Sequence, residues 1–200
     1  YSPKAMRHTL HHHRARFMRW LAEHMPELET FGRQTPRPLD DKADCLRGYR
    51  YHVAIENCVG PHHWTEKLAD PLLGLSLPFY FGCPNAEDYF PAESFIRIDI
   101  RDPAAALARM RAAISANEYE RRLPALMEAR RRVLFEYNFF AVIAREIRRL
   151  HRAQEQAEAG ATVLSRRALR QSSSWVALAD FYGKVRGRLL HLPDAIRGRA

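Results

Sequence analysis

The feature that most constrains the fold of this chain is an alternation of strand-like and helix-like segments in its middle part. Tyr49–Ile55 places apolar residues at every second position, and the apolar runs 77–81 and 94–100 predict two further strands. Helices are predicted to begin at Thr65, a potential N-cap, and after Asp102, which precedes a proline suited to the first helical position. This order predicts an α/β fold, a Rossmann-like parallel sheet with flanking helices.

The loop between the first predicted strand and the following helix is the first candidate for a ligand site. It runs from Glu56 to Thr65 and contains the turn signal Gly60-Pro61. In open parallel sheets, ligands bind outside the carboxyl ends of the strands, where this loop is expected to lie. The predicted fold therefore indicates this loop before any motif is considered.

Helical segments are predicted on both sides of the sheet region. Apolar residues at helical spacing predict a helix from about His8 to Met25. After the sheet we expect Pro124 to interrupt a helical region, and residues 130–156 to form one long amphipathic helix. We expect the chain to divide into residues 1–156, which hold the sheet, and a basic, helical C-terminal extension, residues 157–200.

The overall composition limits the functional classes. The net charge of +9 at pH 7 favours a partner that carries phosphate, although a solvated basic helix face is as common a cause. No run of about 18 apolar residues predicts a transmembrane helix, and the first residues lack the apolar stretch that is typical of a signal peptide. Cys45, Cys58 and Cys83 are widely spaced, which argues against a disulfide framework or a zinc site. We expect a reducing, cytoplasmic location.

Five sequence blocks follow one another around the predicted sheet. They are the helix Arg14 to Leu21, the turn Phe31-Gly32-Arg33, YRYHVAIEN followed after seven residues by TEK, PFYFG, and YFPAESFIRID. A single TEK would have no diagnostic value, but the ordered set resembles the donor-binding region of glycosyltransferase family 10, the α1,3/4-fucosyltransferases. The resemblance covers about residues 1 to 115 and implies the C-terminal half of a GT-B glycosyltransferase.

The resemblance implies an inverting enzyme that binds GDP-fucose and transfers fucose to a hydroxyl of a glycan acceptor in an α1,3-type linkage. It implies no cofactor and no metal, and it makes residues 1–156 the nucleotide-sugar-binding domain. No catalytic residue is assigned here, because the family's general base lies in an N-terminal half that we expect to precede Tyr1. The implied donor-binding residues are Arg14, Glu56, Asn57, His63, Thr65, Glu66 and Lys67.

The chemistry of these residue types agrees with that role. A diphosphate leaving group carries negative charge that must be stabilised as the glycosidic bond breaks. Lys67 adds a charge to a predicted helix N-terminus, which itself attracts anions, and Arg14 can bind two phosphate oxygens with its planar fork. The resemblance implies that these two cations hold the phosphates. It also implies that Glu66 accepts hydrogen bonds from donor hydroxyls and that Glu56 and Asn57 line the same pocket.

Two departures from the family pattern leave the donor sugar open. His63 stands where family members commonly carry tyrosine, and Phe81 replaces the tryptophan of the family's PVYWG block. One alternative is therefore a family member that uses a different nucleotide sugar. Another is a basic nucleic-acid-binding module, which the net charge suggests. This alternative does not explain the TEK and YFPAESFIRID blocks. We expect no nucleic-acid partner.

The histidines near the N-terminus suggest a metal site only weakly. His8 and His12 are four residues apart and could chelate an ion on one helix face, but no carboxylate completes a familiar set of ligands. A solvated basic helix face explains them better, and no metal site is assigned.

The C-terminal extension combines basic residues with aromatic and aliphatic ones. Residues 165–200 carry eight lysines and arginines but only two acids, Asp180 and Asp194, together with apolar residues such as Trp175 and Phe181. This composition suits a segment that lies peripherally on an anionic membrane, at the cytoplasmic face. Gly183 and Gly187 weaken the prediction of a continuous helix there, and a tail that packs on its own domain is the alternative.

Overall fold

A computed structural model describes residues 10–32, 35, 37–151, 162 and 164–190. Leu10–Ala144 form one compact unit, and the described residues from Arg145 onward belong to a second one. The predicted boundary between residues 156 and 157 lies outside the described residues. None of the helices in the described ranges has the length and apolarity that a membrane crossing requires.

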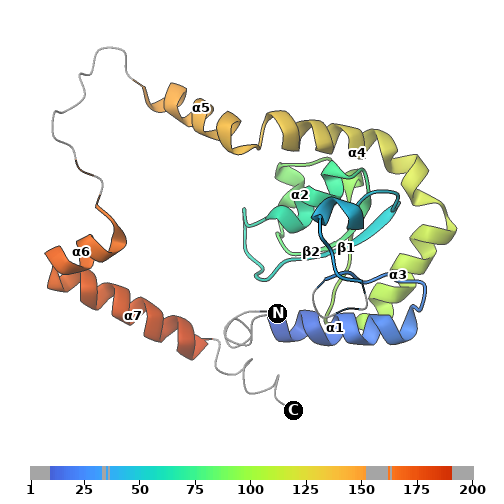
Figure 1. The fold of residues 1–200 in the computed structure, drawn as a ribbon, viewed down its shortest axis with the longest axis horizontal. Coiled ribbons are helices and arrows are strands. Elements are labelled where there is room, and N and C mark those ends of the chain that lie inside the picture. Colours follow the sequence, from blue (N-terminus) through green and yellow to red (C-terminus); the bar gives the residue numbers. More distant parts are fainter. Residues whose placement is uncertain (1–9, 33–34, 36, 152–161, 163, 191–200) are drawn as a thin grey trace. The chain divides into compact units, whose positions relative to one another are not determined.

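The first unit is built on a parallel sheet of three strands in the order β1-β2-β3 (Figure 1). β1 (Tyr51–Ile55) pairs with β2 (Leu77–Phe81) so that Tyr51 lies opposite Leu77. β2 pairs with β3 (Ile96–Arg97) through Phe79 and Ile96. The predicted parallel α/β sheet is confirmed.

The third strand is shorter than the predicted run 94–100. A 3₁₀ turn, η4 (Ala92–Ser94), occupies its expected start, and the hydroxyl of Ser94 donates to the carbonyl of Pro91 at 2.7 Å. After β3, Asp99 accepts hydrogen bonds from the backbone and side chain of Arg101 and turns the chain away from the sheet. Local side-chain hydrogen bonds at both ends therefore limit β3 to two residues.

Four helices surround the sheet, with α2 and α4 on one side and α1 and α3 on the other (Figure 1). α1 (His11–His24) precedes β1, α2 (Glu66–Leu73) joins β1 to β2, α3 (Pro103–Ser115) follows β3, and α4 (Glu118–Phe135) crosses over α2. Thr65 and Asp102 cap α2 and α3 with their side chains, as the sequence predicts. Two short 3₁₀ turns, η2 (Lys42–Cys45) and η3 (Ala86–Asp88), complete this unit.

The core contains the inward faces of the sheet and of all four helices. Its fully buried large side chains include Phe17, Leu21, Leu68, Leu72, Leu77, Phe79, Tyr80, Phe90, Met110 and Leu126. Burial of each such side chain stabilises the fold by about 1.5–3 kcal/mol relative to exposure. This packing fixes α1 and α2 against the sheet and thereby places their N-termini.

Two helix predictions are wrong in detail. α4 is continuous through Pro124, although proline cannot donate the usual hydrogen bond to the carbonyl of Glu120. The helix continues because Leu126 and Ala129 on the following turn are buried against the core. The single helix expected from residue 130 onward is instead divided. α5 (Phe139–Leu150) starts anew because the side chain of Asn138 accepts the amide of Ala141 at 2.9 Å; residues 152–156 lie outside the described part.

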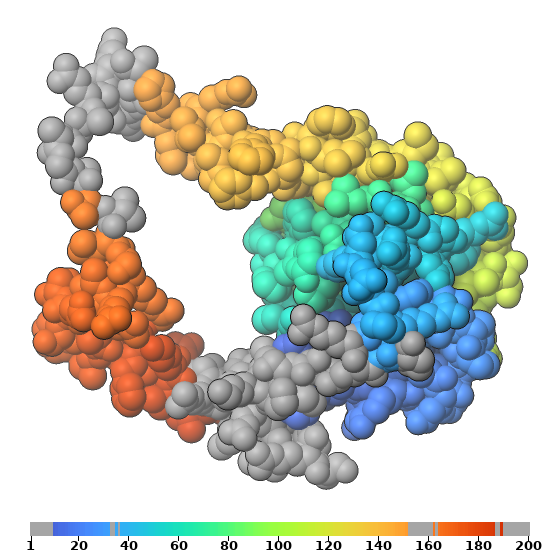
Figure 2. All heavy atoms as spheres, in the orientation of Figure 1, coloured from blue at the N-terminus to red at the C-terminus, as the bar shows by residue number. Residues whose placement is uncertain are grey.

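The second unit contains α6 (Arg166–Ser172) and α7 (Ser174–Leu190), whose atoms form the orange-to-red block of Figure 2. Asp180 of α7 is an ion-pair partner of Arg166 and Arg170 on α6 and of Lys184 one turn further on. α7 is continuous across Gly183, so the expected weakening of this helix does not break it.

Gly82, directly after β2, allows two buried side chains to pass close to the backbone. A Cβ atom at this position would lie 2.3 Å from Cγ of Glu56 and 2.7 Å from the hydroxyl of Tyr80. Both side chains are fully buried and hydrogen-bonded, so neither can move aside at low cost.

We therefore expect Gly82→Ala to lower the free energy of unfolding by about 1–3 kcal/mol, the range for forced overpacking of a core. Gly60→Ala is the matched control, since its nearest atom, Cβ of His63, lies at an ordinary 3.8 Å. Urea denaturation of the two variants makes the comparison. Equal stability of both variants would contradict the close packing at Gly82.

Candidate functional site

Glu56 follows β1 directly and is fully buried. Its amide donates to the carbonyl of Phe81 at 2.8 Å, which extends the pairing of β1 with β2 by one residue. Its carboxylate accepts the amide of Thr65 at 2.8 Å and the hydroxyl of Thr65 at 2.6 Å. The structure thus places Glu56 behind the surface of the loop, as the support of Thr65.

Thr65 connects this buried carboxylate to the start of α2. Its hydroxyl oxygen accepts the amide of Lys67 at 3.3 Å, in the manner of a helix N-cap. Because Glu56 fixes Thr65, the N-terminus of α2 has a fixed position at the carboxyl end of the sheet. A helix N-terminus in this position carries partial positive charge and can bind an anion.

Asn57 brings α1 to the same end of the sheet. Its side-chain oxygen accepts a hydrogen bond from the guanidinium of Arg14 at 3.0 Å. Its backbone carbonyl accepts the amide of Leu10 at 3.1 Å, just before α1 begins. Two contacts from one residue thereby tie the start of α1 to the end of β1.

Lys67 lies in the first turn of α2, and its side chain is only 19% exposed. Its ammonium donates to the carboxylate of Glu66 at 2.7 Å, and this hydrogen bond lowers the pKa of Glu66. Glu66 is more exposed than Lys67, so its carboxylate is accessible to a ligand while it balances part of the lysine charge.

His11 joins these residues although sequence reasoning gave it no role. Burial lowers the pKa of His11, and the charges of Arg14 and Lys67 lower it further. The charges of a residue on α1 and of a residue on α2 thus both act on this one imidazole. The sequence does contain a signal that His11 lies beside Arg14, because the two residues are three positions apart and share one face of α1.

Six of the seven predicted donor-binding residues are thus connected around the ends of β1, α1 and α2. They are Arg14, Glu56, Asn57, Thr65, Glu66 and Lys67. The seventh, His63, is exposed towards the end of the loop, where its amide donates to the carbonyl of Gly60 at 3.2 Å. Arg33 of the predicted FGR turn lies outside the described residues.

The described residues contain no group of three or more potential metal ligands. Of the two histidines considered as chelators, His8 is outside the described residues, and His12 belongs to α1. The absence of a metal requirement stays a prediction.

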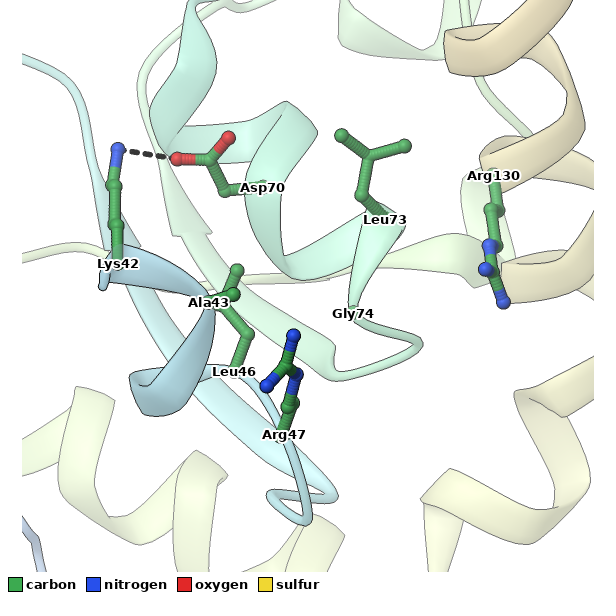
Figure 3. A pocket seen from close by; sticks show the side chains of 8 residues that line it. All are labelled: Lys42, Ala43, Leu46, Arg47, Asp70, Leu73, Gly74 and Arg130. Atoms are coloured by element: carbon green, nitrogen blue, oxygen red, sulfur yellow. Dashed lines mark ion pairs between the residues drawn. The ribbon is translucent and has the colours of Figure 1, made fainter.

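A cavity of about 470 Å³ lies at the opposite, C-terminal end of α2 (Figure 3). Lys42 and Asp70 form an ion pair on one side, and Leu46, Leu73 and Gly74 contribute apolar surface. None of the predicted donor-binding residues lines this cavity. The candidate donor site is therefore the group of residues at the N-terminal end of α2, and this cavity is not part of it.

Comparison with known proteins gives a family match for this chain. Residues 5–122, more than half of the chain, match the model of the glycosyltransferase family 10 (fucosyltransferase) C-terminal domain. Similar curated proteins include alpha-(1,3)-fucosyltransferase B of Drosophila melanogaster, 41% identical over 23% of this chain and 10% of its own length. A 4-galactosyl-N-acetylglucosaminide 3-alpha-L-fucosyltransferase of Pongo pygmaeus is 31% identical over 43% of this chain and 25% of its own length.

A solved structure with similarity to this chain is an α1,3-fucosyltransferase crystallised with GDP-fucose. It is 22% identical, with a TM-score of 0.47, over 55% of this chain and 34% of that chain. The chain thus spans a quarter or less of the two curated relatives and about a third of the solved structure. Because residues 5–122 match the family model, this chain belongs to glycosyltransferase family 10, the fucosyltransferases. It contains the C-terminal domain region of that family.

Proposed function

We propose that this chain is the donor-binding part of an inverting fucosyltransferase, which binds GDP-fucose and transfers fucose to a glycan hydroxyl in an α1,3-type linkage. The observation that carries the proposal is that hydrogen bonds hold Arg14 at Asn57 and Lys67 in the first turn of α2, both beside the loop that follows β1. In a family 10 chain, two cations beside a helix N-terminus form a site of the right chemistry for a nucleotide diphosphate.

In this proposal the site stabilises the leaving group. As the bond from fucose to the diphosphate breaks, negative charge grows on the phosphate oxygens, and Arg14 and Lys67 stabilise it. The amide dipoles of α2 add to the same effect. Because Glu56 and Asn57 hold both helix starts in place, little reorganisation accompanies the reaction.

Other residues of the site orient the donor. The exposed carboxylate of Glu66 accepts hydrogen bonds from sugar hydroxyls, and His63 in the loop contacts the base or the sugar. Such fixed contacts raise the rate by holding the reacting carbon in line with the acceptor. The general base that deprotonates the acceptor hydroxyl is not among the residues of this site.

A different nucleotide sugar is the alternative within the same family. It is supported by His63, and by Phe81, whose ring lies at the end of β2 with the Arg101 guanidinium 5.8 Å from its centre. Calorimetric titration with GDP-fucose, other GDP-sugars and UDP-sugars distinguishes the two. Preferential binding of a UDP-sugar would favour the alternative.

The proposal predicts that GDP binds without a divalent metal, because fixed cations neutralise its phosphates. Calorimetry in the presence of EDTA should give the same dissociation constant as without it.

Lys67→Ala should weaken GDP binding by about tenfold or more, the effect of losing a charged hydrogen bond. In the intact enzyme it should slow transfer by roughly 10²–10³, the scale of one charge-stabilising group.

Lys42→Ala is the matched control, since Lys42 pairs with Asp70 near the other end of α2. Its GDP affinity should equal that of the wild type. If EDTA abolishes binding, or if the two lysine variants behave alike, the proposed phosphate site is wrong.

We infer in addition that α6 and α7 associate peripherally with an anionic membrane, at the cytoplasmic face. α7 exposes large apolar side chains, among them Trp175 at 80%, Phe181 at 63% and Tyr182 at 66%. They border a hollow of about 500 Å³ on this helix. Asp180 forms ion pairs with three cations, and because one carboxylate neutralises only one positive charge, positive charge remains in excess there. Exposed aromatic residues beside cations suit the interface of an anionic bilayer.

Co-sedimentation with vesicles tests this association. The full chain should sediment with phosphatidylglycerol-containing vesicles at low salt and remain soluble with purely zwitterionic ones. A double substitution, Trp175→Glu with Phe181→Glu, should abolish sedimentation. Met127→Glu, at an exposed apolar position of α4, should not. Retention of the wild type in the supernatant under all conditions would refute the inference.

A further inference from the structure

The central part of the loop between β1 and α2, residues Cys58–Trp64, is here called the donor loop. It carries His63 and contains an unusual backbone conformation at His62, which has a φ of 60°. This left-handed region is uncommon for residues other than glycine, although histidine adopts it more often than most, and surrounding contacts help to hold it. The contacts around His62 therefore need an explanation.

Asn85, in the loop that follows β2, makes those contacts. Its side-chain oxygen accepts the amide of His62 at 2.7 Å, and its side-chain nitrogen lies 2.9 Å from Nδ1 of the same imidazole. The nitrogen also donates to the carboxylate of Asp88 at 2.6 Å. A backbone amide can only donate and a carboxylate only accepts, so these two partners fix the orientation of the Asn85 amide.

The orientation of the Asn85 amide group favours one tautomer of the His62 imidazole. The Asn85 nitrogen can donate to Nδ1 of His62, an arrangement in which the imidazole proton lies on Nε2. The hydroxyl of Tyr89 lies 2.8 Å from the same Nδ1. One side chain of the loop after β2 thus binds both the backbone and the ring of His62.

A second anchor holds the end of the donor loop. The ring of Trp64 contacts those of Tyr89, Phe90 and Tyr137 with centroid distances of 5.7, 5.0 and 5.6 Å. Arg132 of α4 donates to the carbonyl of Tyr89 at 2.9 Å, which connects this cluster to the core. His63 therefore lies between two fixed residues, with His62 on one side and Trp64 on the other.

We propose that Asn85 is a positioning residue for the donor: by holding His62 in the left-handed conformation, it sets the path of the donor loop and the placement of His63. Asn85 does not itself contact the donor in this proposal. The role rests on the proposed function, because it assumes that the donor loop borders the GDP-fucose site.

The test combines amide hydrogen exchange with GDP calorimetry on the full chain of residues 1–200. Asn85→Ala should accelerate exchange in residues 58–64 while exchange in β2 and α2 stays unchanged. GDP affinity should fall by about 5- to 30-fold, as expected for the loss of one or two kcal/mol of loop stabilisation. Glu87→Gln, in the same loop but paired with Arg97, is the matched control and should leave both measurements at wild-type values.

A second substitution separates positioning from general destabilisation. Glycine adopts a positive φ without steric cost, so His62→Gly in the Asn85→Ala background should recover part of the lost affinity. A general loss of stability would show no such recovery. If Asn85→Ala does not fold, Asn85→Asp applies the same test, since it keeps the acceptor for the His62 amide but loses the donor to Nδ1.

The outcomes for this inference and for the proposed function are distinct. Wild-type exchange rates and wild-type GDP affinity in the Asn85 variants would overturn the positioning role. If the wild-type chain binds no GDP or GDP-fucose, the proposed function fails. The exchange rates of residues 58–64 then decide whether Asn85 anchors this loop.

Discussion

The carboxylate of Glu56 is the group on which the geometry of the candidate site depends. It stands at the end of β1, is fully buried, and binds Thr65 by two hydrogen bonds. Each buried carboxylate oxygen needs such a partner, because an unsatisfied one costs about 1–3 kcal/mol or more. Through this contact the sheet determines where α2 begins, and the absence of a side chain at Gly82 gives Glu56 the space it needs.

The same end of the sheet collects contacts from three other segments. Asn57 binds α1, Asn85 binds the donor loop, and Trp64 packs on the aromatic cluster next to α4. These groups are polar or aromatic residues that follow strands, where loops of a parallel sheet converge. The residues that we propose bind the donor come from distant parts of the sequence and are held on one scaffold, as a preorganised site requires.

Much of the fold could be predicted from the sequence, because period-2 runs and capped helix starts are local signals. Tyr51–Ile55, Thr65 and Asp102 show this directly. The shortness of β3 and the passage of α4 through Pro124 could not be predicted, since hydrogen bonds and burial outside each segment decide them. For the candidate site, an ordered motif predicts Arg14 and Lys67 as donor-binding residues, and this role stays a prediction. The contacts of Asn85 with His62 join two loops that are distant in the sequence, and no local pattern records them.

The central claim is that Arg14 and Lys67 meet at the diphosphate of a nucleotide-sugar donor, and His11 can report on it. Burial and these two cations lower the pKa of His11 in the unliganded chain. A bound diphosphate would offset both positive charges, so saturation with GDP-fucose should raise this pKa. NMR titration of the imidazole, assigned with His11→Gln, measures the change. A His11 pKa that stays the same while calorimetry shows GDP-fucose bound would contradict the claim.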